Sequence, residues 1–129
     1  MERVLGRFTN EFYAFLRIVA GFLFACHGAQ KLLGALGGHQ VQLASQFGLA
    51  GIIEMVGGTL IAIGLFTSPV AFVASGEMAF AYFQVHAPKS LWPIQNGGEL
   101  AVLYCFLFLY MASRGSGPLS VDRLVRGKK

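Results

Sequence analysis

FYAFLRIVAGFLFACHGAQKLLGAL, residues 12–36, is an apolar run that predicts a helix crossing a membrane. Such a helix needs about 20 apolar residues to cross a hydrocarbon core about 30 Å thick, and this run is longer than that. Three further apolar segments cover about residues 49–66, 70–87 and 98–112, separated by Gly, Pro, Ser and Asn clusters. Open strands would leave backbone groups unpaired in lipid. We therefore predict a single all-α domain, an integral membrane bundle of four transmembrane helices with a basic tail over 113–129.

The composition indicates a membrane protein rather than a soluble one. Of the 129 residues, 55% are hydrophobic and 12% are charged, whereas about 25% of residues are charged in a soluble domain. We expect a multi-pass protein of a bacterial-type plasma (inner) membrane. We do not expect the first run to be a cleaved signal peptide, because Arg17 interrupts it and Phe24 is too bulky for a cleavage box.

The basic residues predict the orientation of the helices. Arg3 and Arg7 precede the first helix, and five more follow the last one: Arg114, Arg123, Arg126, Lys128 and Lys129. Within the predicted first and third loops, Lys89 is the one Lys or Arg. Because Lys and Arg accumulate on the cytoplasmic side of a membrane, both termini are predicted to be cytoplasmic. The net charge of +4 then indicates contact with anionic lipid and not with nucleic acid.

The tail over residues 120–127 has two interpretations. It forms a short amphipathic helix on the membrane surface, with Ser120 as N-cap and Asp122 in the first turn, or it is a frayed basic anchor. The sequence leaves both open.

Ionisable residues inside the apolar segments are costly, so they are expected to face the bundle interior and to pair. Counted at about 1.5 Å per residue from the predicted helix ends, Arg17 and Glu77 lie at similar depth on the cytoplasmic side. We predict an ion pair between them, with the structural role of fixing how the first and third helices align.

A second set of polar residues lies near the outer side by the same count. We predict that they form a ligand-binding pocket open to that side: His27, Lys31, Glu54, His86, Asn96 and Glu99. Simpler roles are open for three of them. In these simpler interpretations, the Lys31 side chain extends to the membrane surface and His86 is solvated beside a loop. Glu99 is then a carboxylate stabilised by the dipole at a helix start.

Cys26 and Cys105 are the two thiols of the chain. They form no CxxC motif and lie in apolar sequence, so we interpret them as inert. The histidines and carboxylates show no strong metal-ligand spacing, and no metal site is predicted.

Four sequence patterns together resemble a known family of small membrane proteins. They are R-x3-G-x2-F-x2-H-G-x2-K-L-x-G over 17–34, E-x2-G-G-x-L-x3-G-L-x-T over 54–67, N-G-G-E-L-A over 96–101 and G-x-G-x2-S-x-D over 115–122. As a set they are similar to the helix and tail signatures of the DoxX family. The third helix carries the least recognisable pattern.

The resemblance implies a four-helix inner-membrane protein linked to redox systems. In the wider group, the DoxD type is similar to a thiosulfate:quinone oxidoreductase subunit, and other members associate with oxidative-stress or sulfur-handling partners. The leading hypothesis is therefore a non-catalytic accessory or scaffold subunit of a multi-subunit complex with membrane or peripheral redox proteins. If the chain is catalytic, its chemistry is oxidoreductase-associated. Its pocket would hold a quinone headgroup or another small ligand, with Lys31 and His27 donating to a carbonyl and Glu54 orienting or protonating it.

Two other functions compete with this one. The chain could be a small transporter or proton-conducting element that uses Glu54, Glu77 and Glu99 as relay carboxylates; at this size it would work as a homo-oligomer. It could also be a purely structural subunit of a larger membrane assembly, in which the polar groups only lock the bundle.

Overall fold

The computed structural model describes residues 1–127, and that part of the chain is helical with no strand. This confirms the all-helical prediction. The predicted roles of Lys128 and Lys129 lie outside the described residues.

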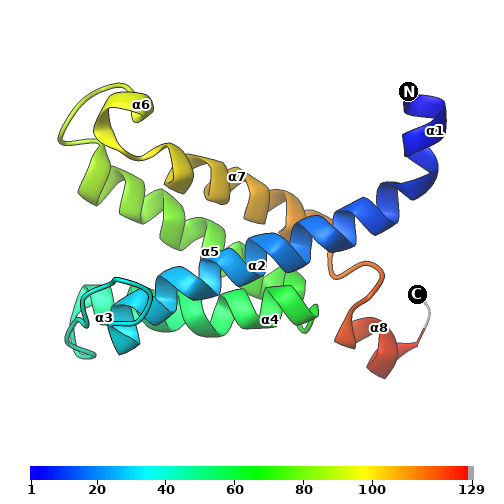
Figure 1. Cartoon of the computed structure of the whole chain (residues 1–129), viewed down its shortest axis with the longest axis horizontal. Coiled ribbons are helices and arrows are strands. Elements are labelled where there is room, and N and C mark those ends of the chain that lie inside the picture. Colours follow the sequence, from blue (N-terminus) through cyan, green and yellow to red (C-terminus); the bar gives the residue numbers. More distant parts are fainter. Residues whose placement is uncertain (128–129) are drawn as a thin grey trace.

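Four helical rods make up most of the molecule (Figure 1). Each is one continuous run, although two of them contain a π-helical turn. The first rod joins α1 (Glu2–Leu5), η1 (Gly6–Phe8) and α2 (Thr9–Leu33); the second joins α3 (Gln46–Ile52), η2 (Ile53–Gly57) and α4 (Gly58–Ile63). The third joins α5 (Thr67–Ala81) and η3 (Tyr82–His86), and the fourth is α7 (Glu99–Arg114). Two short helices flank α7: α6 (Pro93–Asn96) and α8 (Val121–Arg126).

Two of the rods, Glu2–Leu33 and Gln46–Ile63, are long and apolar enough to cross a membrane. Only 39% and 33% of their most apolar windows are buried inside the molecule. Large apolar side chains such as Phe22, Phe72 and Phe106 point outward from three different rods. A water-soluble domain rarely exposes so much contiguous apolar surface, whereas hydrocarbon accommodates it.

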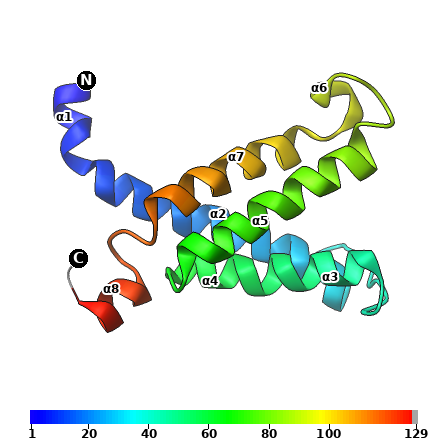
Figure 2. The ribbon, with the colours of Figure 1, turned by 180° about the vertical axis from the view of Figure 1, so that it is seen from behind.

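The rods are arranged as two pairs that diverge. The first rod packs along the second, and α5 packs along α7. The two pairs meet near the turn between α4 and α5 and separate toward the end that carries α3 and α6 (Figures 1 and 2). Between them lies an aromatic contact, in which the rings of Phe24 and Phe108 are 4.7 Å apart and Tyr104 stacks on Phe108 at 5.2 Å.

Glycines permit the close approach of the first and second rods. A Cβ on Gly28 would collide with the backbone of Met55, and one on Gly58 would collide with the backbone of Ala25. Helices approach closely in lipid where small residues face each other. A Cβ on Gly21 would likewise collide with the backbone of Ala62, so this contact depends on the absence of side chains at these positions.

The predicted Arg17–Glu77 ion pair is wrong. Arg17 is fully buried, and its guanidinium donates to the carbonyl oxygens of Ile61 (2.8 Å), Ala62 (2.7 Å), Pro118 (3.2 Å) and Leu119 (2.7 Å). The physical reason is that α4 ends at Ile63, so the carbonyl groups of its last turn lie at the open end of the helix and carry the negative end of its dipole. The two terminal nitrogens of this buried cation are thus paired by the backbone rather than by a carboxylate, whereas its Nε has no hydrogen-bond partner within residues 1–127.

The tail forms the short helix α8, with the Ser120 hydroxyl accepting from the Arg123 N–H at 3.2 Å. In α8, the Asp122 carboxylate accepts hydrogen bonds from the Phe66 N–H (3.0 Å) and the Ser116 hydroxyl (2.5 Å). The Asp122 N–H in turn donates to the Gly64 carbonyl at 3.0 Å. Together with Arg17, these bonds dock the tail on the turn between the second and third rods.

Candidate functional site

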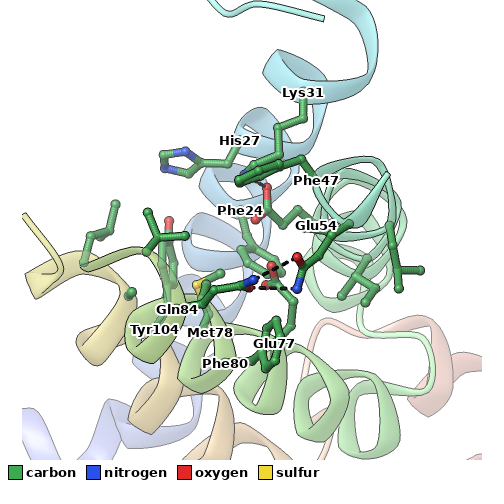
Figure 3. A pocket seen from close by; sticks show the side chains of 18 of the residues that line it. Phe24, His27, Lys31, Phe47, Glu54, Glu77, Met78, Phe80, Gln84 and Tyr104 are labelled. Atoms are coloured by element: carbon green, nitrogen blue, oxygen red, sulfur yellow. Dashed lines mark hydrogen bonds and ion pairs between the residues drawn. The ribbon is translucent and has the colours of Figure 1, made fainter. Parts of the chain in front are cut away.

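A cavity of about 670 Å³ occupies the space between the diverging pairs of rods (Figure 3). All four rods contribute to its wall, which is mostly apolar. Polar and aromatic lining residues come from α2 (Phe24, His27, Lys31), from the second rod (Gln46, Phe47, Glu54), from the third (Glu77, Gln84, His86) and from α7 (Tyr104).

Lys31 and Glu54 form the central polar contact of the cavity. The Lys31 Nζ lies 2.5 Å from the Glu54 Oε2, and the exposed fractions of the two side chains are 29% and 3%. Glu54 is in the π-helical turn η2, a local widening of the helix that occurs frequently at functional sites. The structure thus brings together two of the predicted pocket residues, one from each rod of a close-packed pair.

Glu77 joins this contact from the third rod. Its carboxyl group lies close to that of Glu54, and its buried Oε2 has no hydrogen-bond partner within residues 1–127. The depth count missed this because the third rod begins at Thr67 rather than at residue 70. At about 1.5 Å per residue, Glu77 is then about 15 Å into the rod and reaches the level of Glu54.

His27 and Tyr104 form the aromatic side of the cavity. Their rings meet edge to face with centroids 6.3 Å apart, and Tyr104 also contacts Phe24 at 5.4 Å. Sequence reasoning did not identify Tyr104, because it lies in an aromatic-rich helix where nothing distinguishes it from its neighbours. Its burial, in contrast to the exposed Leu103, is a property of the packed structure.

Of the other predicted pocket residues, His86 lines the cavity, with its Nδ1 3.2 Å from the backbone oxygen of Asn96. Asn96 does not line it. Its buried side chain donates to the Ser90 carbonyl (3.0 Å) and the Tyr82 hydroxyl (3.3 Å) and accepts from the Gly98 N–H (2.8 Å), which orders the loop before α7.

Glu99 also lies outside the cavity, exposed in the first turn of α7. The sequence count placed it at the right level of the bundle but could not tell which way its side chain points. Its position at a helix start is the one that favours a carboxylate electrostatically.

Gln46 and Gln84 bridge the edge of the cavity. Each side-chain amide donates to the other's oxygen, at 2.7 and 2.9 Å, between the start of α3 and the π-helical turn η3 (Figure 3). Both residues are exposed and line the cavity. Two neutral amides at this spacing gave no signal in the sequence, since their pairing depends on how far the two rods diverge.

Cys26 and Cys105 are free thiols, both partly buried, and neither lines the cavity. Within residues 1–127, no group of three or more His, Cys, Asp or Glu side chains is arranged to hold a metal ion.

The family model for DoxX matches residues 12–87. The chain belongs to the DoxX family. This confirms the resemblance noted in the sequence patterns, and the matched residues supply Lys31, Glu54 and Glu77 from three of the four cavity walls. The large apolar side chains that the rods expose are consistent with membership of this family of membrane proteins.

Two relatives of this DoxX protein cover most of its length. An "Uncharacterized protein" of Haemophilus influenzae is 42% identical over 125 residues, 92% of this chain and 93% of the relative. A Bacillus subtilis protein named "Putative oxidoreductase CatD" is 30% identical over 122 residues, 88% of this chain and 87% of the relative. No solved structure gives a significant match.

Proposed function

We propose that this DoxX protein is an accessory subunit of a redox-linked membrane complex and that its cavity holds a small amphipathic ligand of the quinone class. In this proposal, all four rods span the plasma membrane, both termini are cytoplasmic, and the cavity lies in the outer half of the bilayer. The ligand would place its polar headgroup at Lys31 and Glu77 and its apolar body along the aromatic wall.

The observation that carries the proposal is the buried Glu77 Oε2 without a hydrogen-bond partner in the described part of the chain. A buried polar atom left unpaired costs free energy, so its presence at a cavity points to a ligand that pairs with it. The ammonium group of Lys31 has further N–H donors besides the one directed to Glu54. The cavity therefore offers a donor and an acceptor to one headgroup.

A quinone headgroup matches these groups chemically. Its carbonyl oxygen accepts from Lys31, and the hydroxyl of its reduced form donates to a carboxylate such as Glu77. Ligand sites are commonly apolar with a few convergent polar groups, as in this cavity. The printed name of the Bacillus subtilis relative, "Putative oxidoreductase CatD", supports a redox setting.

The side chains present bind and protonate a headgroup rather than transfer electrons to it. Lys31, Glu54 and Glu77 are suited to hydrogen bonding and proton exchange, and both thiols lie outside the cavity. Electrons would then come from a partner redox protein, which is why we propose an accessory role and not an independent enzyme.

The orientation of the cavity supports ligand entry from the lipid. Several of its lining side chains are exposed on the outer surface of the second and third rods, among them Phe47, Val73 and Phe80. A ligand dissolved in the bilayer would enter between these rods, past the Gln46–Gln84 amide pair.

The distribution of charge supports the proposed topology. Both termini, α1 and α8 lie toward the same end of the molecule (Figure 1), and Arg3, Arg7, Arg114 and the arginines of α8 belong to the segments at that end. Lys31 and Lys89 lie toward the other end. This is the asymmetry expected when the termini are cytoplasmic.

The test is to purify the protein from its native membranes in mild detergent and to analyse the extracted lipids and co-purifying proteins by mass spectrometry. We expect bound quinone and a redox partner protein. Lys31→Met and Glu77→Gln should lose the quinone, whereas Lys89→Met and Glu99→Gln, which make the same chemical changes outside the cavity, should keep it. A wild-type protein without quinone, which also fails to bind an added short-chain quinone, would refute the proposal.

The closeness of the Glu54 and Glu77 carboxyls favours a second candidate function, proton conduction by an oligomer. Two carboxyls beside one ammonium reach charge balance when one carboxyl holds a proton, and such groups in membrane helices commonly form proton relays. In proteoliposomes with an internal pH dye, this function predicts a proton flux that Glu77→Gln abolishes and Glu99→Gln does not.

A further inference from the structure

A second cavity, also of about 670 Å³, lies at the opposite end of the molecule from Gln46 and Gln84. It is a groove lined by the turn that begins α5, the segment that follows α7, and α8. Figure 2 shows that these segments lie toward one end of the molecule. Its charged lining residues are Arg114, Arg123, Arg126 and Asp122. Three guanidinium groups face one carboxylate, so the groove is electropositive.

Asp122 offsets only one of the three guanidinium charges, so the groove keeps a positive balance. Its carboxylate already accepts from Ser116 (2.5 Å) and the Phe66 N–H (3.0 Å), and Arg126 is 3.9 Å away. The hydrogen bond from Ser116, followed by the Phe66 N–H and the Arg126 charge, lowers the pKa of Asp122 below its ordinary value. The carboxylate is therefore committed to docking the tail.

Two of the arginines are held in place by contacts that leave part of each guanidinium open. Arg114 lies over the Tyr13 ring at 4.2 Å and donates to the Asn10 Oδ1 (2.5 Å) and the Tyr110 hydroxyl (3.0 Å). Arg126 lies over the Phe66 ring at 5.5 Å. When a cationic side chain is already held in place, less conformational entropy is lost as the ligand binds.

Arg123 completes the cationic set. Its side chain is exposed and has no hydrogen-bond or ion-pair partner within residues 1–127. A planar guanidinium binds phosphate oxygens in a bidentate manner, which makes arginine well suited to phosphate groups.

Apolar side chains lie in and beside the groove as well. Phe66, which is half exposed, lines it, and the exposed Leu119, Leu124 and Val125 belong to the same tail segment as its lining residues. Cationic and apolar groups side by side on a short helix are typical of segments that lie at the membrane interface. A freely soluble anion has no apolar portion that could contact these apolar side chains.

We infer that this groove binds the headgroup phosphate of an acidic phospholipid, with Arg123 and Arg126 on the phosphate, Arg114 on the same charge from the far wall, and the acyl chains along Leu119 and Phe66. The positive balance of the groove selects an anionic lipid over a zwitterionic one. The bound lipid would hold α8 and the docked tail against the membrane surface. This inference requires a membrane-embedded chain but does not depend on what the first cavity binds.

Native mass spectrometry of the full-length protein in detergent, titrated with phosphatidylglycerol or phosphatidylcholine, tests the inference. We expect phosphatidylglycerol to bind more tightly, and the double variant Arg123→Gln/Arg126→Gln to lose roughly tenfold or more of that affinity. The matched control is Arg3→Gln/Arg7→Gln, which removes the same charge from the same end but outside the groove.

Several results would overturn it. Equal binding of the two lipids, or an equal loss in the control variant, would indicate a nonspecific charge effect. Inorganic phosphate that displaces the lipid, and binds equally well alone, would indicate a site for soluble anions. Circular dichroism and thermal unfolding of both double variants verify that the fold is retained, and Arg123→Lys, which keeps the charge, should retain most of the affinity.

Discussion

The Lys31 ammonium and the Glu54 carboxylate form an ion pair of 2.5 Å between the first and second rods, with Glu54 almost fully buried. Glu77 approaches the same carboxylate from the third rod. One cation thus serves two acidic groups from different helices. The contact links the first two rods, and because the two pairs of rods diverge at this level, it also forms the polar part of the cavity wall.

Lys31→Met is expected to destabilise the protein by about 3–5 kcal/mol, since it leaves a buried carboxylate without its partner. Glu54→Gln should cost less, and the double variant should cost clearly less than the sum of the two. Equilibrium unfolding in mixed micelles measures these free energies, with Lys89→Met as a control that should change little. Additive losses would mean that the two residues do not interact.

Arg17→Lys is expected to release the tail, because an ammonium group cannot span the carbonyls of α4 and those of Pro118 and Leu119 at once. We expect a loss of about 3 kcal/mol or more, from buried carbonyls left unpaired, together with faster proteolysis after residue 114. Limited proteolysis followed by mass spectrometry detects this. Arg7→Lys makes the same change on an exposed residue, and cleavage rates that are the same in both variants would contradict the role of Arg17.

Gly28→Ala is expected to destabilise the pairing of the first and second rods by about 1–3 kcal/mol, because its methyl group meets the backbone of Met55 and neither helix can move locally. Gly76→Ala provides the opposite control. That position is helical, and nothing lies within 4 Å of its added Cβ, so alanine should stabilise by about 0.5–1 kcal/mol. Thermal unfolding of both variants should move in opposite directions; a shared direction would argue against tight packing at Gly28.

The docking of the tail is expected to weaken at acidic pH. The hydrogen bonds of Asp122 lower its pKa in the folded protein, so its stabilising contribution is present above the ordinary aspartate pKa, about 3.9, and is lost as the pH falls through the folded value. The protection of the Phe66 and Asp122 amides against hydrogen exchange, relative to an unstructured chain at the same pH, should therefore fall below about pH 4. In Asp122→Asn this protection should be lower at neutral pH and less dependent on pH. An unchanged pH dependence in that variant would mean that another group controls docking.

Much of the fold could be predicted from the sequence because it depends on local properties. Each apolar segment is long enough and regular enough to form a helix, and the Gly- and Pro-containing segments between them end it. Arg17 was recognisable as a buried cation and Glu54 as a buried acid for the same reason, since they interrupt apolar runs.

The partners of these residues were decided by the tertiary structure. Arg17 binds carbonyl groups, which every residue has and no pattern reveals. Glu77 reached the cavity because the third rod starts three residues earlier than its apolar run, whereas Glu99 faces away from it.

The sequence by itself thus determined the helices, the apolar surface and the family patterns, since hydropathy and helix periodicity act within one segment. Only the tertiary structure decided how closely the first two rods pack, through their glycine contacts, and how far the two pairs of rods diverge, through contacts between the pairs such as that of Phe24 with Phe108. The cavity, its Lys31–Glu54–Glu77 cluster and the arginine groove at the other end all follow from that divergence and from the docking of the tail.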